Sequence, residues 1–447
     1  MSVKNKTQKI MSKFKERVLL NCAFPVADKV MGTCAMKWYR KIEQMNTWSK
    51  AEVLEWQTAQ MHKLVEHAYF HTRYYHEVMD GVGIKPMDIK TLDDLKLFPI
   101  LTREIIKERF NDLMADNIKR YPHRKSSTGG STGQPMQYIC DENTWGFVTA
   151  MKIYSWKQTG YRYGDLFVSL GSSSLFPVNK KSPVHEIYFR LKNTIPLNGM
   201  NMDDQTCGKY MEIIRKHNVR YIYGYATAIY LLARYCRENQ IEWHFDAAFA
   251  TAEKLTDYYR QVIIDTWGTQ VMDCYGSKDG GITAYEIESG KYYVGYAAWL
   301  EASDKEPSEL YATNLINFAF PTIRYANRDE VMLWDDSVDS KYNGQLLRDV
   351  IGRTSDVLSF ENGHKLTTSG FTILFRGFNV EAYRIIKKGG LSMLIQIQKR
   401  ENYSQEEHEL LYATVKKYVG EEVGVDFEYV DEFEPLKNGK RSFFINE

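Results

Sequence analysis

One stretch does most to decide the fold of this chain: SSTGGSTGQP, residues 126–135, with three glycines and five hydroxyl residues in ten positions. Glycine accepts backbone angles that are closed to other residues, so consecutive N–H groups can converge on an anion, and the hydroxyl groups add further donors. We therefore predict a loop that holds the phosphates of a nucleoside triphosphate.

The loop differs from the common P-loop. That motif places Lys-Ser or Lys-Thr directly after its last glycine, whereas Gln134-Pro135 follows Gly133 here. A flexible linker is the alternative at this point, because runs of Gly, Ser and Thr also serve as connectors. Partner motifs elsewhere in the chain decide between the two.

The bulk composition is that of a globular protein. A length of 447 residues indicates two or three domains, and 44% of the residues are hydrophobic while 26% are charged. Lys and Arg number 58 against 57 for Asp and Glu, so the overall charge favours no nucleic-acid partner.

The cysteines indicate a reducing compartment. There are six, at positions 22, 34, 140, 207, 236 and 274, and no two form a C-x-x-C pair. This spacing argues against a zinc site and against a disulfide scaffold. We expect a cytoplasmic protein.

The N-terminus combines basic residues at 4–17 with an apolar stretch, Val18–Ala27. Asn21 and Pro25 interrupt that stretch, so an amphipathic helix is favoured over a secretory signal. No other segment approaches the roughly 18 apolar residues of a membrane span, and a soluble protein is expected. Weak peripheral attachment to an anionic membrane through the basic end is the alternative.

Periodicity outlines the elements along the chain. Residues 37–80 have helical spacing, and His67 and His71 within them lack a third metal ligand, which favours ordinary core or surface histidines. Later apolar runs alternate with helical segments, which predicts helix-covered sheets of an α/β protein. The expected strands are 166–170, 221–223, 271–275, 393–398 and 424–430, and the expected helices are 208–216, 226–238 and 404–419.

Four further segments accompany the glycine-rich loop. Tyr275–Gly281 follows an expected strand, where ligands bind in open α/β sheets. Phe320–Tyr325 leads to Asp329, a cation and a carboxylate suited to ribose hydroxyls. Arg353 lies in the third segment, 351–356, and the fourth is a basic loop at 437–441. Each segment alone is weak evidence, but their order is specific.

That order resembles the adenylate-forming superfamily, which joins a carboxylate to AMP, and most closely its phenylacetate-CoA ligase branch. The nearest subgroup is the one encoded with capsular polysaccharide genes. This rests on an opening region at 67–103 and on three motifs, TGGSTG at 128–133, YGY at 223–225 and PTIRY at 321–325. The resemblance implies a large N-terminal domain, 1–354 with a helical extension over 1–100, and a small mobile α+β domain, 355–447.

The resemblance also implies a role for each motif residue. Lys440 would bridge the carboxylate and the α-phosphate of ATP as a catalytic cation, Thr128 would join it in catalysis, and Asp279 would bind Mg²⁺. Asp329 would hold the ribose hydroxyls and Arg353 would support the nucleotide. The remaining nucleotide-binding residues would be Ser127, Gly129, Gly130, Ser131, Thr132 and Gly133 around the phosphates, and Ala252, Glu253, Tyr275, Gly276 and Ser277 around the adenine and α-phosphate.

The chain departs from the superfamily pattern at several positions. Asp279 stands where a glutamate is usual, and Lys278 replaces a small hydroxyl residue. Ser355 occupies the hinge position that is usually charged. No lysine follows Gly133, so Lys125 or Lys440 would have to neutralise the phosphates.

The implied function is ATP-dependent activation of a carboxylic acid as an acyl-adenylate with release of pyrophosphate. The acyl group would then pass to CoA or to an amine, such as a sugar or an amino acid in surface polysaccharide biosynthesis. Two alternatives stay open: an adenylyltransferase that acts on a hydroxyl of a small cofactor, and a non-catalytic nucleotide-binding assembly protein.

Overall fold

The computed structural model describes residues 16, 18–127, 136–171, 193–199, 202, 204–303, 308–333, 342–353, 357–360, 365–367, 374–375, 378–431, 433 and 444–446. The chain divides into two compact units. The first comprises residues 1–304, 310–327 and 333–349, and the second comprises 305–309, 328–332 and 350–447. The proposed boundary between residues 354 and 355 stays a prediction.

The first unit begins with a set of helices, as the spacing over 37–80 predicted. Ser49 and Glu52 form a capping box at the start of α4, and the Thr72 hydroxyl accepts from the Tyr75 N–H at the start of α5. The apolar N-terminal stretch is also helical. These elements are η1 (Leu19–Ala23), α2 (Phe24–Met31), α3 (Ala35–Met45), α4 (Lys50–His71), α5 (Arg73–Val82), η2 (Pro86–Asp88), η3 (Leu92–Leu97), α6 (Arg103–Glu108), α7 (Phe110–Leu113) and η4 (Ile118–Arg120).

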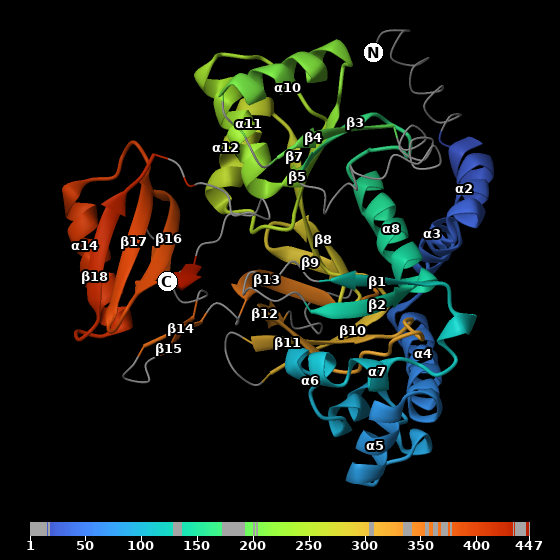
Figure 1. Cartoon of the computed structure of the whole chain (residues 1–447). Coiled ribbons are helices and arrows are strands. Elements are labelled where there is room, and N and C mark those ends of the chain that lie inside the picture. Colours follow the sequence, from blue (N-terminus) through green and yellow to red (C-terminus); the bar gives the residue numbers. More distant parts are fainter. Residues whose placement is uncertain are drawn as a thin grey trace. The chain divides into compact units, whose positions relative to one another are not determined.

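A two-stranded hairpin and a large mixed sheet follow (Figure 1). The hairpin pairs β1 (His123–Ser127) with β2 (Gln137–Asp141). Within the described residues the sheet has the order β10-β11-β12-β13-β9-β8-β7-β6-β5-β3-β4. Its strands are β3 (Phe167–Gly171), β4 (Thr194–Asn198), β5 (Tyr221–Tyr225), β6 (Ala247–Thr251), β7 (Gln270–Ser277), β8 (Ile282–Glu288), β9 (Lys291–Val294), β10 (Ala298–Ala302), β11 (Ser308–Asn314), β12 (Tyr325–Leu333) and β13 (Leu346–Arg353).

The strands from β3 to β7 pair in parallel, and helices cover them on both faces. Tyr221 and Tyr223 of β5 join one hydrophobic cluster, while Ile222 between them joins another, as the alternation of side chains along a strand requires. The expected α/β class is therefore confirmed. The helices that alternate with these strands are α8 (Glu142–Lys157), α10 (Asp204–Lys216), α11 (Ala226–Glu238) and α12 (Asp257–Trp267).

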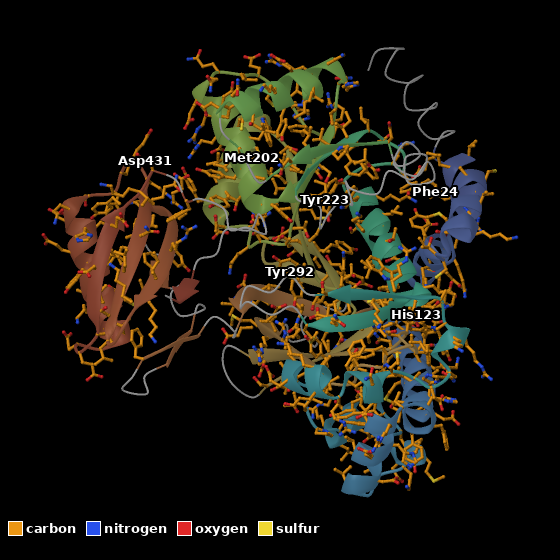
Figure 2. The ribbon with its side chains drawn as sticks, viewed as in Figure 1. Phe24, His123, Met202, Tyr223, Tyr292 and Asp431 are labelled. Carbon is orange, nitrogen blue, oxygen red and sulfur yellow. The ribbon has the colours of Figure 1, made fainter. Side chains whose placement is uncertain are left out.

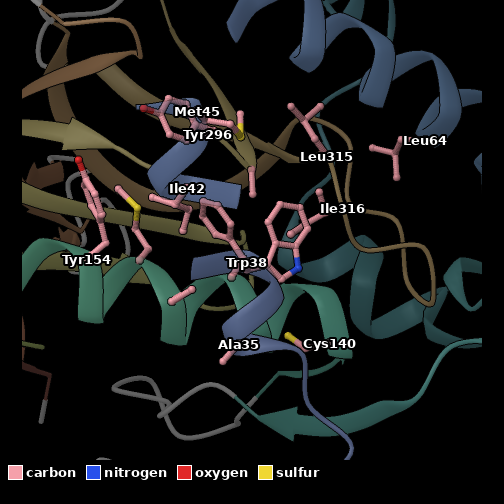
Figure 3. Packing of buried hydrophobic residues seen from close by; sticks show 14 of the residues in the cluster. Ala35, Trp38, Ile42, Met45, Leu64, Cys140, Tyr154, Tyr296, Leu315 and Ile316 are labelled. Carbon is pink, nitrogen blue, oxygen red and sulfur yellow. The ribbon is translucent and has the colours of Figure 1, made fainter. Parts of the chain in front are cut away.

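Aromatic packing fills the first of these clusters. The Trp156 ring of α8 stacks on Phe249 of β6, with the ring centroids 4.3 Å apart. Trp38 and Ile42 of α3 and Tyr154 of α8 contribute to the same cluster (Figure 3). The sheet and the N-terminal helices therefore share one core.

The second unit contains a small α+β fold. Four of its described strands form a sheet with the order β18-β17-β16-β19, and Ile385, Ile395 and Leu411 are fully buried in its core. The expected strand, helix and strand of this region are confirmed. The elements are β14 (Val357–Ser359), β15 (Lys365–Thr367), β16 (Val380–Lys388), β17 (Ser392–Lys399), α14 (Gln405–Val419), β18 (Gly424–Tyr429) and β19 (Phe444–Asn446).

Of the helices that the structure describes, none combines the length and the apolar character that crossing a bilayer requires.

Candidate functional site

The candidate site lies at one edge of three adjacent parallel strands, where β5 and β6 end beside β7. Tyr225 of β5 pairs with Thr251 of β6, and Thr251 pairs with Cys274 of β7. The segments that follow these strands therefore lie at one edge of the sheet, the edge at which open α/β folds bind ligands. Ala252, Glu253 and the predicted turn after Cys274 all belong to this edge.

The hairpin flanks the glycine-rich loop. Ser127 at the end of β1 is exposed and pairs with Gln137 of β2. The other predicted phosphate-binding residues, at 128–133, lie outside the described residues. The position of the loop's two ends is nevertheless defined by this strand pairing, which starts at His123 (Figure 2).

One tyrosine links the residue directly before β2, at the loop end of the hairpin, to the predicted magnesium ligand. The Tyr325 hydroxyl donates to an Asp279 carboxylate oxygen at 2.8 Å, and the same hydroxyl lies 3.8 Å from Met136 Sδ. Tyr325 is fully buried, at 0% exposure. It therefore holds the chain just after the glycine-rich loop beside the turn after β7. Tyr325 is the last residue of the PTIRY motif at 321–325, and the motif alone does not reveal this contact.

The turn itself starts later than the sequence indicated. β7 continues through Tyr275, Gly276 and Ser277, which pair with β8, so Gly276 is part of a strand. The glycine that the turn requires is Gly281: its φ is +69°, and a Cβ there would lie 2.4 Å from Asn314 Nδ2. The Ser277 hydroxyl donates to Asp279 at 2.5 Å and so closes the turn.

The carboxylate of Asp279 could provide one ligand in the coordination shell of Mg²⁺. Its two oxygens each accept one hydroxyl hydrogen bond, and each keeps a further lone pair. Mg²⁺ at phosphate sites uses one or two carboxylates together with phosphate oxygens and water. No group of three or more His, Cys, Asp or Glu side chains arranged for a metal occurs within the described part of the chain.

The segment after β6 forms a second side of the edge. Ala252 has φ +66°, a left-handed conformation that costs a non-glycine residue energy and often marks a functional site. A Glu253 carboxylate oxygen accepts from the Thr227 N–H at 3.0 Å, in the first turn of α11. Glu253 therefore caps this helix, where its charge also suits the helix dipole.

Of the residues predicted to lie near the adenine and ribose, some have defined contacts or burial, and others lie outside the described part of the structure. The Tyr275 hydroxyl accepts from Asn327 Nδ2 at 3.0 Å, which ties β7 to β12. Asp329 lies on β12 with 7% exposure. Arg353 is the last residue of β13, and its side chain lies outside the described part of the structure, as does all of Lys440.

Arg324, in the segment that leads to Asp329, forms an ion pair with Glu301. Its guanidinium donates to both oxygens of Glu301, at 3.1 and 3.3 Å, and to the Phe98 carbonyl at 2.7 Å. Burial raises the pKa of Glu301, although the charge of Arg324 opposes this shift. Arg324 is therefore held in an ion pair inside the fold, and the assignment of Asp329 to the ribose hydroxyls stays a prediction.

The paired histidines have ordinary roles. His67 Nε2 lies 2.8 Å from the Phe318 carbonyl, and His71 Nδ1 lies 2.8 Å from an Asp116 carboxylate oxygen. Burial lowers the pKa of His67. Both rings thus use a nitrogen to join the N-terminal helices to neighbouring segments.

Comparison with known proteins supports the motif analysis. Residues 358–447 match the family described as the CapK C-terminal domain. The chain is 22% identical over 419 residues to Protein CapK of Staphylococcus aureus, with 92% of each chain covered. It is 23% identical over 355 residues to a phenylacetate-coenzyme A ligase of Escherichia coli strain K12, covering 71% of this chain and 75% of the relative.

A solved structure has the same fold. 2-Hydroxyisobutyryl-CoA ligase, in its postadenylation state with 2-HIB-AMP, matches with a TM-score of 0.68 at 16% identity, covering 91% of this chain and 92% of that one. The fold is therefore that of the adenylate-forming acyl-CoA ligases. In sequence, the chain is a homologue of CapK and of the phenylacetate-CoA ligases, which confirms the resemblance drawn from the motifs.

Proposed function

We propose that this protein activates a carboxylic acid with ATP, forms an acyl-adenylate and releases pyrophosphate. The observation that carries the proposal is the Tyr325 link, which holds the base of the glycine-rich loop beside Asp279 at the carboxyl edge of the parallel strands. The relationship to phenylacetate-CoA ligases supports it independently. We further propose that the acyl group passes to CoA or to an amine.

The first step brings anions together. A carboxylate oxygen attacks the α-phosphorus of ATP, a P–O bond forms, and the bond to the leaving pyrophosphate breaks. The site must offset the repulsion between these groups and align them, because positioning and electrostatics supply most of the catalysis in phosphoryl chemistry. Mg²⁺, when bound, would neutralise phosphate charge, and Asp279 would hold it.

The chain's own residues divide this work. N–H and hydroxyl groups at 127–133 would bind the β- and γ-phosphates. Ala252, Glu253 and Tyr275–Ser277 would border the adenine and the α-phosphate, while Asp329 would accept from ribose hydroxyls and Arg353 would support the nucleotide. Lys440 would bring a positive charge to the carboxylate and α-phosphate when the C-terminal unit closes.

The second step transfers the acyl group. The thiol of CoA or a neutral amine attacks the acyl carbonyl, the new C–S or C–N bond forms, and AMP leaves while the nucleophile gives up its proton. We propose, from the motif resemblance to the subgroup encoded with capsular polysaccharide genes, a role in building a surface polysaccharide, in which a sugar amine or an amino acid would be the acceptor.

A non-catalytic nucleotide-binding role is the second candidate. It is favoured by the site itself, since both Asp279 oxygens are hydrogen-bonded and Lys278 lies next to them in sequence. Such a protein would bind ATP but release no pyrophosphate with any acid. An adenylyltransferase would instead leave AMP attached to its product.

A trapping screen separates these functions. Purified protein is incubated with Mg·ATP, a panel of carboxylic acids and hydroxylamine, and pyrophosphate and hydroxamate are measured together. We expect one acid class to give both products in equal amounts. Pyrophosphate without hydroxamate, with AMP bound to a product, would support adenylyl transfer, and neither product with any acid would support the non-catalytic role.

A further inference from the structure

A pocket lies among α3, α4 and the start of α8, and it takes none of its lining from β5, β6 or β7. Its volume is about 520 Å³, which is within the range of small-molecule sites. It therefore lies apart from the candidate nucleotide site, and nothing in the proposed reaction uses it.

The charge of this pocket has one sign. Lys37, Arg40 and Lys41 line it from α3, together with Gln44. These four positions have the i, i+3, i+4, i+7 spacing of one helix face. Like charges at i+3 and i+4 repel one another, so this arrangement costs the helix some stability. A ligand of opposite charge would remove that cost.

The three cations have no acidic partner among the described residues. The Arg40 guanidinium donates to Asn21 Oδ1 at 3.4 Å, and the Lys41 ammonium lies 4.2 Å from the centre of the Trp48 ring. The acid of the same helix, Glu43, pairs with Lys157 at 2.8 Å. The positive charge on this face of α3 is therefore not neutralised by a described carboxylate.

The rest of the lining is aromatic and apolar. Trp38 is 8% exposed, its ring lies 6.3 Å from that of Trp56, and both line the pocket with Ile316. Figure 3 shows the Trp38 indole beside Ile316. Such a surface suits the uncharged body of a ligand, because apolar area removed from water and ring contacts both favour binding.

An amide adds directional donors. Asn143 lines the pocket, and its Oδ1 accepts from the Trp38 indole N–H at 3.3 Å. This bond fixes the orientation of the amide, and the two N–H donors of the side chain are on its NH₂ group. Among the described residues, no acceptor pairs with these two N–H groups. Donors oriented in this way suit phosphate oxygens.

We propose that this pocket binds a small organic phosphate with a flat or apolar body. Two lysines and an arginine would offset the double negative charge of the phosphate group. The arginine can bind two phosphate oxygens at once. The tryptophans would contact the uncharged part of the ligand. A ligand bound in this pocket would contact α3, α4 and α8 at the same time.

The test is a calorimetric titration of the full-length protein without ATP. The probes are phenyl phosphate, inorganic phosphate and benzyl alcohol, which separate the charged part from the apolar part. We expect phenyl phosphate to saturate a site, inorganic phosphate to bind at least about tenfold more weakly, and benzyl alcohol to give no measurable binding. The double variant Lys37→Gln/Arg40→Gln should bind phenyl phosphate at least about tenfold more weakly.

The matched control is the double variant Lys209→Gln/Lys216→Gln, an equal change of charge at two exposed positions on α10. It should bind phenyl phosphate within about twofold of the unmodified protein. Thermal unfolding checks that each variant is folded, and the single Lys37→Gln variant, with an intermediate loss, replaces the double variant if that one unfolds. Equal affinity in the pocket variant and the control would overturn the proposal, because phenyl phosphate would then be bound elsewhere. Absence of phenyl phosphate binding, or equally tight binding of benzyl alcohol, would also overturn it.

Discussion

At the scale of single residues, the candidate site depends on side chains that contact two segments at once. Tyr325 contacts both Asp279 and Met136, and Glu253 caps α11 from the segment after β6. A phenol or a carboxylate in such a position fixes the geometry of backbone that the ligand itself would touch. Small changes in these residues should therefore alter activity more than stability.

The Tyr325→Phe variant tests this view. Loss of the hydroxyl removes the bond to Asp279, which should cost about 1 kcal/mol of unfolding free energy, because the ring stays buried. Hydroxamate formation should fall by about tenfold or more, because the turn is less well positioned. Urea unfolding and the trapping assay measure the two effects. Tyr412→Phe on the exposed surface of α14 is the control, and an equal loss of activity in both variants would contradict the role of Tyr325.

At the scale of elements, buried charged and ionisable groups connect segments that are distant in sequence. Arg324, just before β12, pairs with Glu301 of β10, and Asp273 of β7 accepts from the Tyr292 hydroxyl of β9 at 2.7 Å. Figure 2 labels Tyr292 within the sheet. These side-chain contacts join strands to one another in addition to their backbone pairing.

The Glu301→Gln variant should be strongly destabilised. The two side chains of the ion pair are only 7% and 14% exposed, so the substitution would leave the Arg324 charge buried without its partner. We expect a loss of about 3 kcal/mol of unfolding free energy, measured by urea denaturation. Asp93→Asn, which breaks an exposed pair with Lys96, should have little effect. Similar midpoints for the two variants would show that the buried pair is unimportant.

Asp273 predicts a dependence of stability on pH. Burial raises its pKa to about 7, while its unfolded value is near 4. Between these values the folded protein binds a proton that the unfolded chain has lost, so the unfolding free energy should fall as pH rises. From pH 5 to pH 7 the fall from this group should be about 2 kcal/mol.

The Asp273→Asn variant should lack this part of the fall, because it cannot titrate. Urea denaturation at pH 5, 6 and 7 provides the comparison with the unmodified protein. Asp265→Asn, at an exposed position of α12, should retain the dependence. If the unmodified protein and Asp273→Asn showed parallel pH profiles, the buried carboxyl would not be the cause.

At the scale of the whole molecule, the proposed mechanism requires two units of one chain. The sheet of the first unit provides the edge with Asp279, while Lys440 belongs to the segment assigned to the second unit. A cation supplied by a separate unit can act in one half-reaction and leave in the next. We therefore predict that the two half-reactions differ in their need for Lys440.

The Lys440→Ala variant should lose acid-dependent exchange of pyrophosphate into ATP by at least about a hundredfold. Binding of ATP should change little, because the remaining nucleotide contacts come from other segments. Isotope exchange and equilibrium binding measure the two properties. Lys437→Ala, in the same basic segment, is the matched control. Undiminished exchange in Lys440→Ala would remove this lysine from the mechanism.

Much of the fold could be predicted from local patterns. The helices and strands can be read from local patterns, such as the helical spacing over 37–80 and the apolar runs 221–223 and 271–275. This is possible because hydrophobic periodicity and turn chemistry are properties of neighbouring residues. The order of the motifs was likewise sufficient to reach the adenylate-forming class. The amino-acid sequence by itself thus determined the element types, the α/β class and the relationship to acyl-CoA ligases.

Which of these residues meet became clear from the folded chain. The cation of Arg324 pairs with Glu301 rather than with a carboxylate that follows it in the chain, and Tyr325 joins Asp279 to the end of the glycine-rich loop. The cationic pocket beside Trp38 is also a product of packing between helices. No periodicity encodes these contacts, because each depends on how distant segments approach one another once apolar burial has assembled the core.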